Sequence, residues 1–199
     1  MVGLETVVAF LPSLALAIAL AASAGLRAWL PLLAASLLAR FNIIELGESF
    51  GFMASTPAIV IFSVATLLEI CADKVPALDH GLDVISTVVR PLAATLLAGS
   101  VMFQIQDPLW ALALGLIVGA PTALVPHAAK SGARVVSSTT TAGIANPFIS
   151  LLEDLGALVI IIAGVLIPIV TAVVVVLGGV LALRWWRRRS ARPSAPPAG

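Results

Sequence analysis

Residues 148–183 read FISLLEDLGALVIIIAGVLIPIVTAVVVVLGGVLAL, with Glu153 and Asp154 as the only charged side chains. The hydrocarbon core of a bilayer is about 30 Å thick and is crossed by about 20 mostly apolar residues of helix. This stretch is therefore too long for one crossing unless it is strongly tilted. Pro168 cannot continue the backbone hydrogen bonding of a helix, so we expect the chain to turn there and cross a second time.

The composition of the whole chain agrees with a membrane location. Of its 199 residues, 60% are hydrophobic and 11% are charged, whereas a typical soluble domain has about 25% charged residues. So few charges cannot cover a water-facing surface, which excludes a soluble enzyme. The predicted fold class is all-α, a polytopic transmembrane helical bundle that forms a single domain over residues 1–189. Residues 190–199 are rich in Pro and Ala, and we expect them to be a disordered tail.

Four more apolar stretches are candidate spans, and they lie at residues 7–38, 57–72, 84–103 and 108–125. With residues 148–183 split at Pro168, the chain has about six spans. The first stretch is longer than one crossing needs, and Gly25 and Pro31 weaken a helix interior, so we expect an interrupted helix near Ser23–Gly25. Polar loops are expected at residues 42–51, 73–83 and 104–107.

The distribution of Lys and Arg predicts the orientation, because these residues favour the cytoplasmic ends of spans. Six spans place both termini on one side, together with Lys74, Arg90, Lys130, Arg134 and the basic residues of 184–192, and leave Arg40 on the other side. We therefore expect both termini to be cytoplasmic. If residues 148–183 cross only once, this partition is much weaker. A net charge of +1 gives no reason to expect a nucleic-acid partner.

Ionisable groups inside a bilayer are costly, so they usually face a cavity or a partner. Glu69 and Asp73 are four residues apart, on one face of a helix, where they repel each other unless positive charge lies between them. Lys74, Arg90, a bound cation and a shared proton are the alternatives. Glu153 needs a partner such as Arg27, Lys130 or Arg134, or else a proton.

Two further polar segments are candidate ligands. Asp79, His80 and Asp83 could bind a metal ion, or they could belong to a solvated loop that caps the next helix. The hydroxyl run at residues 137–141 leads to Asn146. Free backbone groups there could bind an ion, with Thr141 and Asn146 as neutral ligands, or the run could serve helix capping and close packing.

Four ordered motifs carry a resemblance to a known family. They are AGLRAWLP at residues 24–31, LEICADKVP at 68–76, RPLA at 90–93, and TTAGIANP at 140–147 followed by LED at 152–154. Together they resemble the bacterial domain of unknown function 4126 family. The resemblance implies a small multi-span protein of the bacterial inner membrane, with no established activity. Residues 69–74 are also similar to the Glu-x-Gly-Asp-Lys motif of cation/proton exchangers, although one residue longer and with Ala72 in place of Gly.

These observations favour a transporter or channel for a small ion or solute. The expected pathway residues are Glu69, Asp73, Glu153, Asp154, Asn146, Thr141, Arg27 and Arg90. A non-transporting membrane scaffold or assembly factor is the alternative, and lipid handling is a third. We expect neither enzymatic activity nor a cofactor, although a bound cation is compatible with the sequence. The lipid bilayer is the expected partner, and a homo-oligomer is left open.

Overall fold

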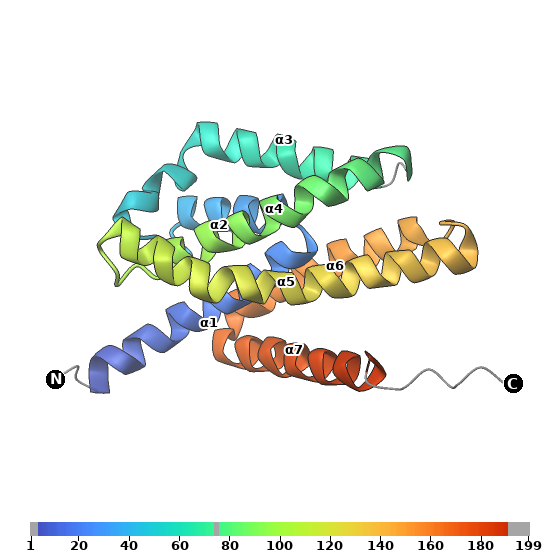
Figure 1. Ribbon diagram of the computed structural model, residues 1–199. Coiled ribbons are helices and arrows are strands. Elements are labelled where there is room, and N and C mark those ends of the chain that lie inside the picture. Colours follow the sequence, from blue (N-terminus) through green and yellow to red (C-terminus); the bar gives the residue numbers. More distant parts are fainter. Residues whose placement is uncertain (1–3, 74–75, 191–199) are drawn as a thin grey trace, which may run out of the picture.

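The computed structural model describes residues 4–73 and 76–190, and every regular element in these ranges is a helix (Figure 1). In chain order the elements are α1 (Leu4–Leu26), α2 (Trp29–Arg40), the 3-10 helix η1 (Glu48–Ala54), α3 (Thr56–Ala72), α4 (Pro76–Val101), α5 (Pro108–Thr141), α6 (Asn146–Leu166) and α7 (Pro168–Ser190). The predicted all-α class is confirmed. The expected tail at residues 191–199 lies outside the described residues.

Three of the described helices are long and apolar enough to cross a membrane on their own. They are α5, α6 and the part of α7 from Pro168 to Trp185. The pair η1 and α3 also passes when taken together, although it is bent by 62°. Apolar but shorter helices lie at Phe10–Leu26, Trp29–Arg40 and Ile85–Val101. The helices α6 and α7 meet at Ile167 and Pro168, which confirms the predicted break in the last apolar stretch.

The first apolar stretch forms a hairpin that turns back inside the bundle. Ser13 on α1 accepts a hydrogen bond from Gln104 over 2.8 Å, and the backbone N–H of Gly47, beyond α2, donates to the carbonyl of Ser100 over 2.8 Å. Both contacts are made at the C-terminal end of α4 and the connection to α5, so the hairpin enters and leaves at one end of the bundle. The predicted interruption is confirmed, at Arg27. Residues 7–38 were expected to make one crossing, whereas α1 and α2 run in opposing directions (Figure 1).

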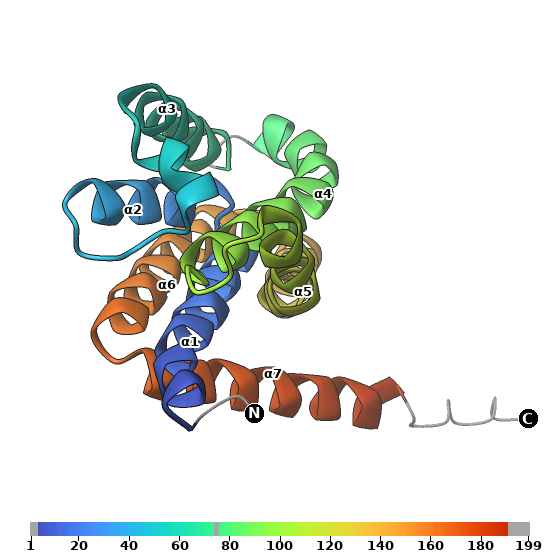
Figure 2. The ribbon, with the colours of Figure 1, turned by 90° about the vertical axis from the view of Figure 1, so that its left-hand side faces the viewer.

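Small residues let the hairpin and the helices around it approach one another closely. A Cβ on Gly25 would lie 2.2 Å from the carbonyl oxygen of Ala123 on α5, and one on Gly115 would lie 2.3 Å from the carbonyl oxygen of Thr95 on α4. Backbones this close pack well by van der Waals contact, which is the main attraction between helices in lipid. The helix α1 thereby packs against α4, α5, α6 and α7, and runs through the middle of the bundle (Figure 2).

One predicted loop is largely helical, and one predicted span continues further than expected. The polar segment at residues 73–83 was expected to be a loop, but α4 already begins at Pro76, since proline suits the first turn of a helix. The predicted span 108–125 continues as α5 to Thr141, past Pro121 and Pro126. The hydroxyl run is the end of that helix, where Thr140 and Thr141 donate to carbonyl oxygens one turn earlier. The run is therefore helical and not an irregular loop.

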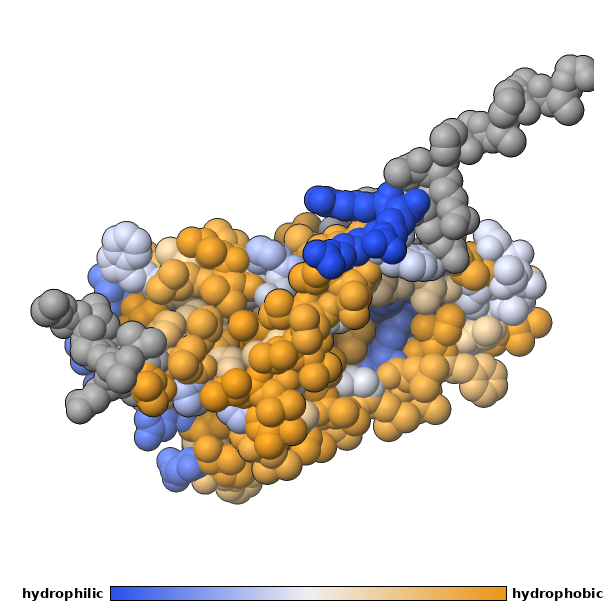
Figure 3. All heavy atoms as spheres, turned by 90° about the horizontal axis from the view of Figure 1, so that it is seen from below, coloured by the Kyte–Doolittle hydropathy of each residue, from blue (hydrophilic) through white to orange (hydrophobic). Residues whose placement is uncertain are grey.

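The outer surface is dominated by hydrophobic side chains. Figure 3 shows such side chains over most of one face of the molecule, with fewer hydrophilic side chains between and beside them. Large exposed apolar residues occur on every long helix, among them Leu68 on α3, Val88 on α4, Ile117 on α5, Val159 on α6 and Leu177 on α7. In water this surface would drive aggregation, whereas in a bilayer it is solvated by acyl chains. The protein is therefore a helical membrane protein in contact with lipid.

Candidate functional site: a buried ion-pair cluster

Arg27 occupies the tip of the α1–α2 hairpin and is completely buried. Its guanidinium forms an ion pair with Asp73 at the C-terminal end of α3. A second ion pair joins its Nε to Asp154 of α6 over 2.6 Å, and a hydrogen bond of 2.7 Å runs to the hydroxyl of Ser150. One side chain thus connects the hairpin tip with two helices that are distant in sequence.

Two basic residues of α5 complete the environment of the acids. Lys130 lies 2.9 Å from Glu153 and 3.2 Å from Asp73. Arg134, one turn later, lies 3.2 Å from Glu153 and 3.0 Å from Asp73. Residues four apart share a helix face, so α5 presents both cations to the same two carboxylates. The prediction that Glu153 pairs with Arg27, Lys130 or Arg134 is confirmed for all three, with Arg27 at 3.9 Å.

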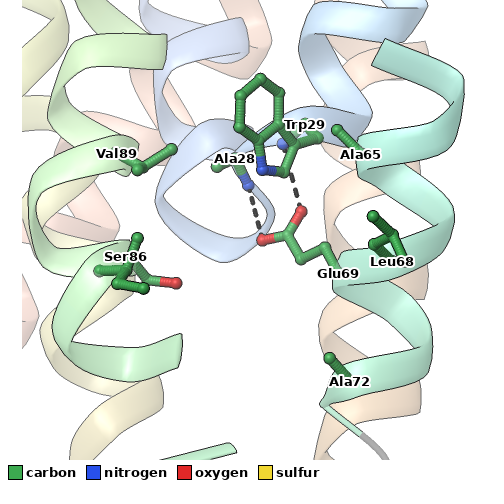
Figure 4. Close-up of a pocket in the computed structure, with 9 residues that line it drawn as sticks. Ala28, Trp29, Ala65, Leu68, Glu69, Ala72, Ser86 and Val89 are labelled. Carbon is green, nitrogen blue, oxygen red and sulfur yellow. Dashed lines mark hydrogen bonds between the residues drawn. The ribbon is translucent and has the colours of Figure 1, made fainter. Parts of the chain in front are cut away.

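The interruption of the hairpin leaves unpaired backbone groups, and charged side chains satisfy them. The carboxylate of Glu69 accepts hydrogen bonds from the N–H groups of Ala28 over 3.0 Å and Trp29 over 3.2 Å (Figure 4). On the other side of the break, Arg90 donates to the carbonyl oxygens of Gly25 and Leu26. An anion therefore lies at the positive end of α2 and a cation at the negative end of α1, as the helix dipoles favour. Arg90 and Glu69 are themselves 3.5 Å apart.

The whole cluster is electrically balanced. Its eight members are four bases and four acids, namely Arg27, Arg90, Lys130 and Arg134 with Glu69, Asp73, Glu153 and Asp154. Taking an ion out of water costs several kcal/mol even after relaxation, so a buried cluster persists only when each charge has close partners. The balance explains how this many charges can lie within an apolar bundle.

Apolar side chains surround the cluster at its own level along the helices. Val135 lies next to Arg134 on α5, and Leu151 and Leu152 lie next to Glu153 on α6, and all three are exposed on the outside of the bundle. The charged side chains point inward from these same helices. The cluster therefore lies inside a shell of apolar side chains.

Six of the eight predicted pathway residues belong to the cluster, and two do not. Thr141 ends α5 and Asn146 begins α6, and there Thr141 accepts from the N–H of Ala145 and Asn146 donates to Ser138. Ser150 was not predicted. Its spacing could have identified it, since it lies three residues before Glu153 and therefore on the same face of α6.

The suggested metal ligands lie in the first turns of α4. The side chains of Asp79, His80 and Asp83 lie outside the described residues, so the metal hypothesis stays a prediction. Within the part of the chain whose side chains are described, no group of three or more His, Cys, Asp or Glu side chains is placed to hold a metal ion. The acids of the cluster face bases instead.

Comparison with known proteins gives one match. No curated protein and no solved structure matches this chain. The family profile described as a domain of unknown function, DUF4126, matches residues 14–188. The match begins in α1 and ends in α7, so it includes every helix that contributes to the ion-pair cluster. The chain therefore belongs to the DUF4126 family.

Proposed function

We propose that this protein transports a small cationic ion or solute across the membrane, and that the ion-pair cluster is its pathway and gate. The observation that carries the proposal is the interruption at Arg27, where two helix ends inside the bundle meet the cluster. Interrupted helices are a common basis of transporter sites, because their free ends and dipoles can bind ions that an intact helix cannot.

The charge balance suggests how a passenger binds. Each carboxylate already faces a basic side chain, so a cation gains little by simple addition. It gains more by replacing a base, for example Arg90 at Glu69, which lies 3.5 Å away. Exchange between an internal base and a passenger keeps the carboxylate of Glu69 paired with a cation in both states. The displaced Arg90 keeps its hydrogen bonds to Gly25 and Leu26.

A non-transporting scaffold is the second candidate, and the same balance supports it. Every acid in the cluster has a base within ion-pair distance, and together they connect the hairpin tip with α3, α4, α5 and α6. Such a network is sufficient to fix how these helices are arranged. On this hypothesis the cluster has no passenger, and it sets only the stability and geometry of the bundle.

Flux through proteoliposomes separates the two candidates. Purified protein is reconstituted, and uptake of protons, monovalent metal cations and small amines is recorded under an imposed gradient. Transport predicts a flux that Asp154→Asn reduces at least tenfold, because Asp154 is a member of the cluster. Glu45→Gln is the matched control, since Glu45 is exposed and lies outside the cluster. No flux of any tested ion by the wild-type protein supports the scaffold.

We further propose a location in the bacterial inner membrane, with the Arg-rich end of α7 in the cytoplasm. Arg184, Arg187 and Arg188 are exposed there and suit a surface of anionic lipid. The hairpin adds no net crossing before α3. The proposed location of the N-terminal end therefore differs from the cytoplasmic one expected from the sequence. The start of α1 then faces the opposite side, together with Arg40. Lys130 and Arg134 no longer support the orientation as loop charges, since they are buried against acids.

A further inference from the structure

A pocket of about 460 Å³ opens next to the cluster, between α3 and α4 (Figure 4). Sites for small molecules usually have volumes of about 300–1,000 Å³, so this one is large enough for a ligand of several carbon atoms. Its walls include Ala28 and Trp29 of the hairpin, Ala65 of α3 and Val89 of α4, and Glu69 is the only acidic residue among the lining residues whose side chains are described.

The chemistry of the walls restricts the ligand. Nearly all of the lining is apolar, apart from the carboxylate of Glu69 and the hydroxyl of Ser86. A carboxylate has about four lone-pair sites and only accepts hydrogen bonds, so the polar end of a ligand must be a donor. The N–H groups of Ala28 and Trp29 occupy part of this capacity. Calcium and magnesium need several oxygen ligands, which a single carboxylate among apolar groups does not supply.

The surroundings of the pocket favour an organic cation. The indole of Trp29 lies beside the carboxylate in Figure 4, and an aromatic face together with a carboxylate attracts an ammonium group. The pocket borders lipid, since Leu68 and Ile85 on its rim are 64% and 58% exposed. A ligand with an apolar body can therefore reach it from the bilayer.

We propose that this pocket binds a free primary amine with an apolar body, its ammonium group on Glu69 and its hydrocarbon part against Trp29, Ala65 and Val89. The assignment rests on the proposed function and specifies its passenger. Ammonium binding at Glu69 takes the place of Arg90, and this couples occupancy of the pocket to rearrangement of the cluster.

Direct binding tests the pocket without any flux measurement. The full chain is placed in nanodiscs of phosphatidylcholine and titrated with n-hexylamine, and binding is followed by calorimetry. Hexanol, hexanoate and ethylamine are the comparison probes, since they lack the charge, reverse it, or lack the apolar body. We expect hexylamine to bind at least tenfold more tightly than each of the three. Equal affinity for hexylamine and hexanol would overturn the proposal.

Variants locate the binding. Ala65→Trp fills the pocket without removing a charge, and it should lower hexylamine affinity at least tenfold. Val64→Trp is the matched control, since Val64 is the neighbouring residue on α3 and is exposed on its lipid-facing side. Unchanged affinity in Ala65→Trp contradicts the assignment. Glu69→Gln should also weaken binding, provided that its thermal unfolding shows a folded protein.

Two further outcomes have defined meanings. Loss of hexylamine binding in nanodiscs that contain phosphatidylethanolamine would overturn the assignment to a free amine, because the lipid headgroup would then be the occupant. Hexylamine binding without flux of any ion or amine supports the pocket and contradicts transport. Flux of inorganic cations without hexylamine binding supports transport and contradicts the pocket.

Discussion

Arg27 and Asp73 form a fully enclosed ion pair that fastens the tip of the α1–α2 hairpin to the C-terminal end of α3. The two residues are 46 positions apart in sequence. Around this pair the other acids and bases of the cluster meet, so the site is organised by a contact between distant segments.

Removing Arg27 should destabilise the protein strongly. Arg27→Gln leaves Asp73 and Asp154 buried with one base fewer, and breaking a buried ion pair by removal of one partner typically costs about 3–5 kcal/mol. Thermal unfolding in detergent measures the loss. Arg40→Gln is the control, since Arg40 is exposed and makes only a 3.3 Å hydrogen bond to the carbonyl of Ala54, and its effect should stay below about 1 kcal/mol. Equal stability of the two variants would contradict the described burial of Arg27.

A neutral pair of substitutions should recover much of the stability that a single one loses. Lys130→Met removes one base and leaves Glu153 and Asp73 with excess negative charge, whereas Lys130→Met with Glu153→Gln removes one base and one acid together. Replacing both partners of a buried ion pair often leaves the stability unchanged. The free energy of unfolding of the double variant should therefore exceed that of Lys130→Met by at least about 1 kcal/mol.

The same double variant discriminates between transport and scaffold. If the cluster is a pathway, the folded double variant loses flux, because a member of the exchange network is missing. If the cluster is only structural, recovery of stability is the whole effect and the wild-type protein shows no flux. Additive effects of the two substitutions on stability would contradict direct coupling between Lys130 and Glu153.

Much of the cluster was predictable because charged residues are rare in this chain. Every acid or base within an apolar stretch must find a partner, so Glu69, Asp73, Glu153 and Arg27 were identifiable from composition alone. Which partners they find was not, since pairing depends on the arrangement of helices. Lys130 and Arg134 were counted as charges outside a span because the predicted span ended at residue 125, whereas α5 continues past Pro121 and Pro126. Within a bundle, neighbouring helices tolerate such prolines, and α5 continues.

The hairpin could not be predicted for a different reason. Hydropathy records that residues 7–38 are apolar, and an apolar stretch with a break has the same composition whether the chain continues across the bilayer or turns back. The turn is stabilised by Glu69 of α3 and Arg90 of α4, which form hydrogen bonds with the free backbone groups at the α1–α2 break. These contacts join segments that no local pattern relates.

The close approach of α1 and α5 should depend on the absence of a side chain at Gly25. A Cβ there would lie 2.2 Å from the carbonyl oxygen of Ala123, so Gly25→Ala forces backbone movement and should cost about 1–3 kcal/mol. Gly132→Ala is the matched control on α5, where a Cβ meets nothing within 4 Å, and it should be neutral or stabilising by up to about 1 kcal/mol. Thermal unfolding of both variants gives the comparison, and loss of stability in Gly132→Ala alone would contradict the packing.

The hairpin also predicts which segments share a side of the membrane. Ser13 contacts Gln104 in the α4–α5 connection and Gly47 contacts Ser100 near the end of α4, so the α2–η1 loop and that connection lie at one end of the bundle, and the α5–α6 turn lies at the other. In a Cys71→Ala background, single cysteines at Asn42 and Gln106 should react with a membrane-impermeant maleimide from one side, and cysteines at Ser138 and Arg188 from the other. A tag placed before Leu4 should be accessible from the side of Asn42, because the hairpin returns to its starting surface. Accessibility of that tag from the side of Arg188 would contradict the hairpin and restore a single crossing for residues 7–38.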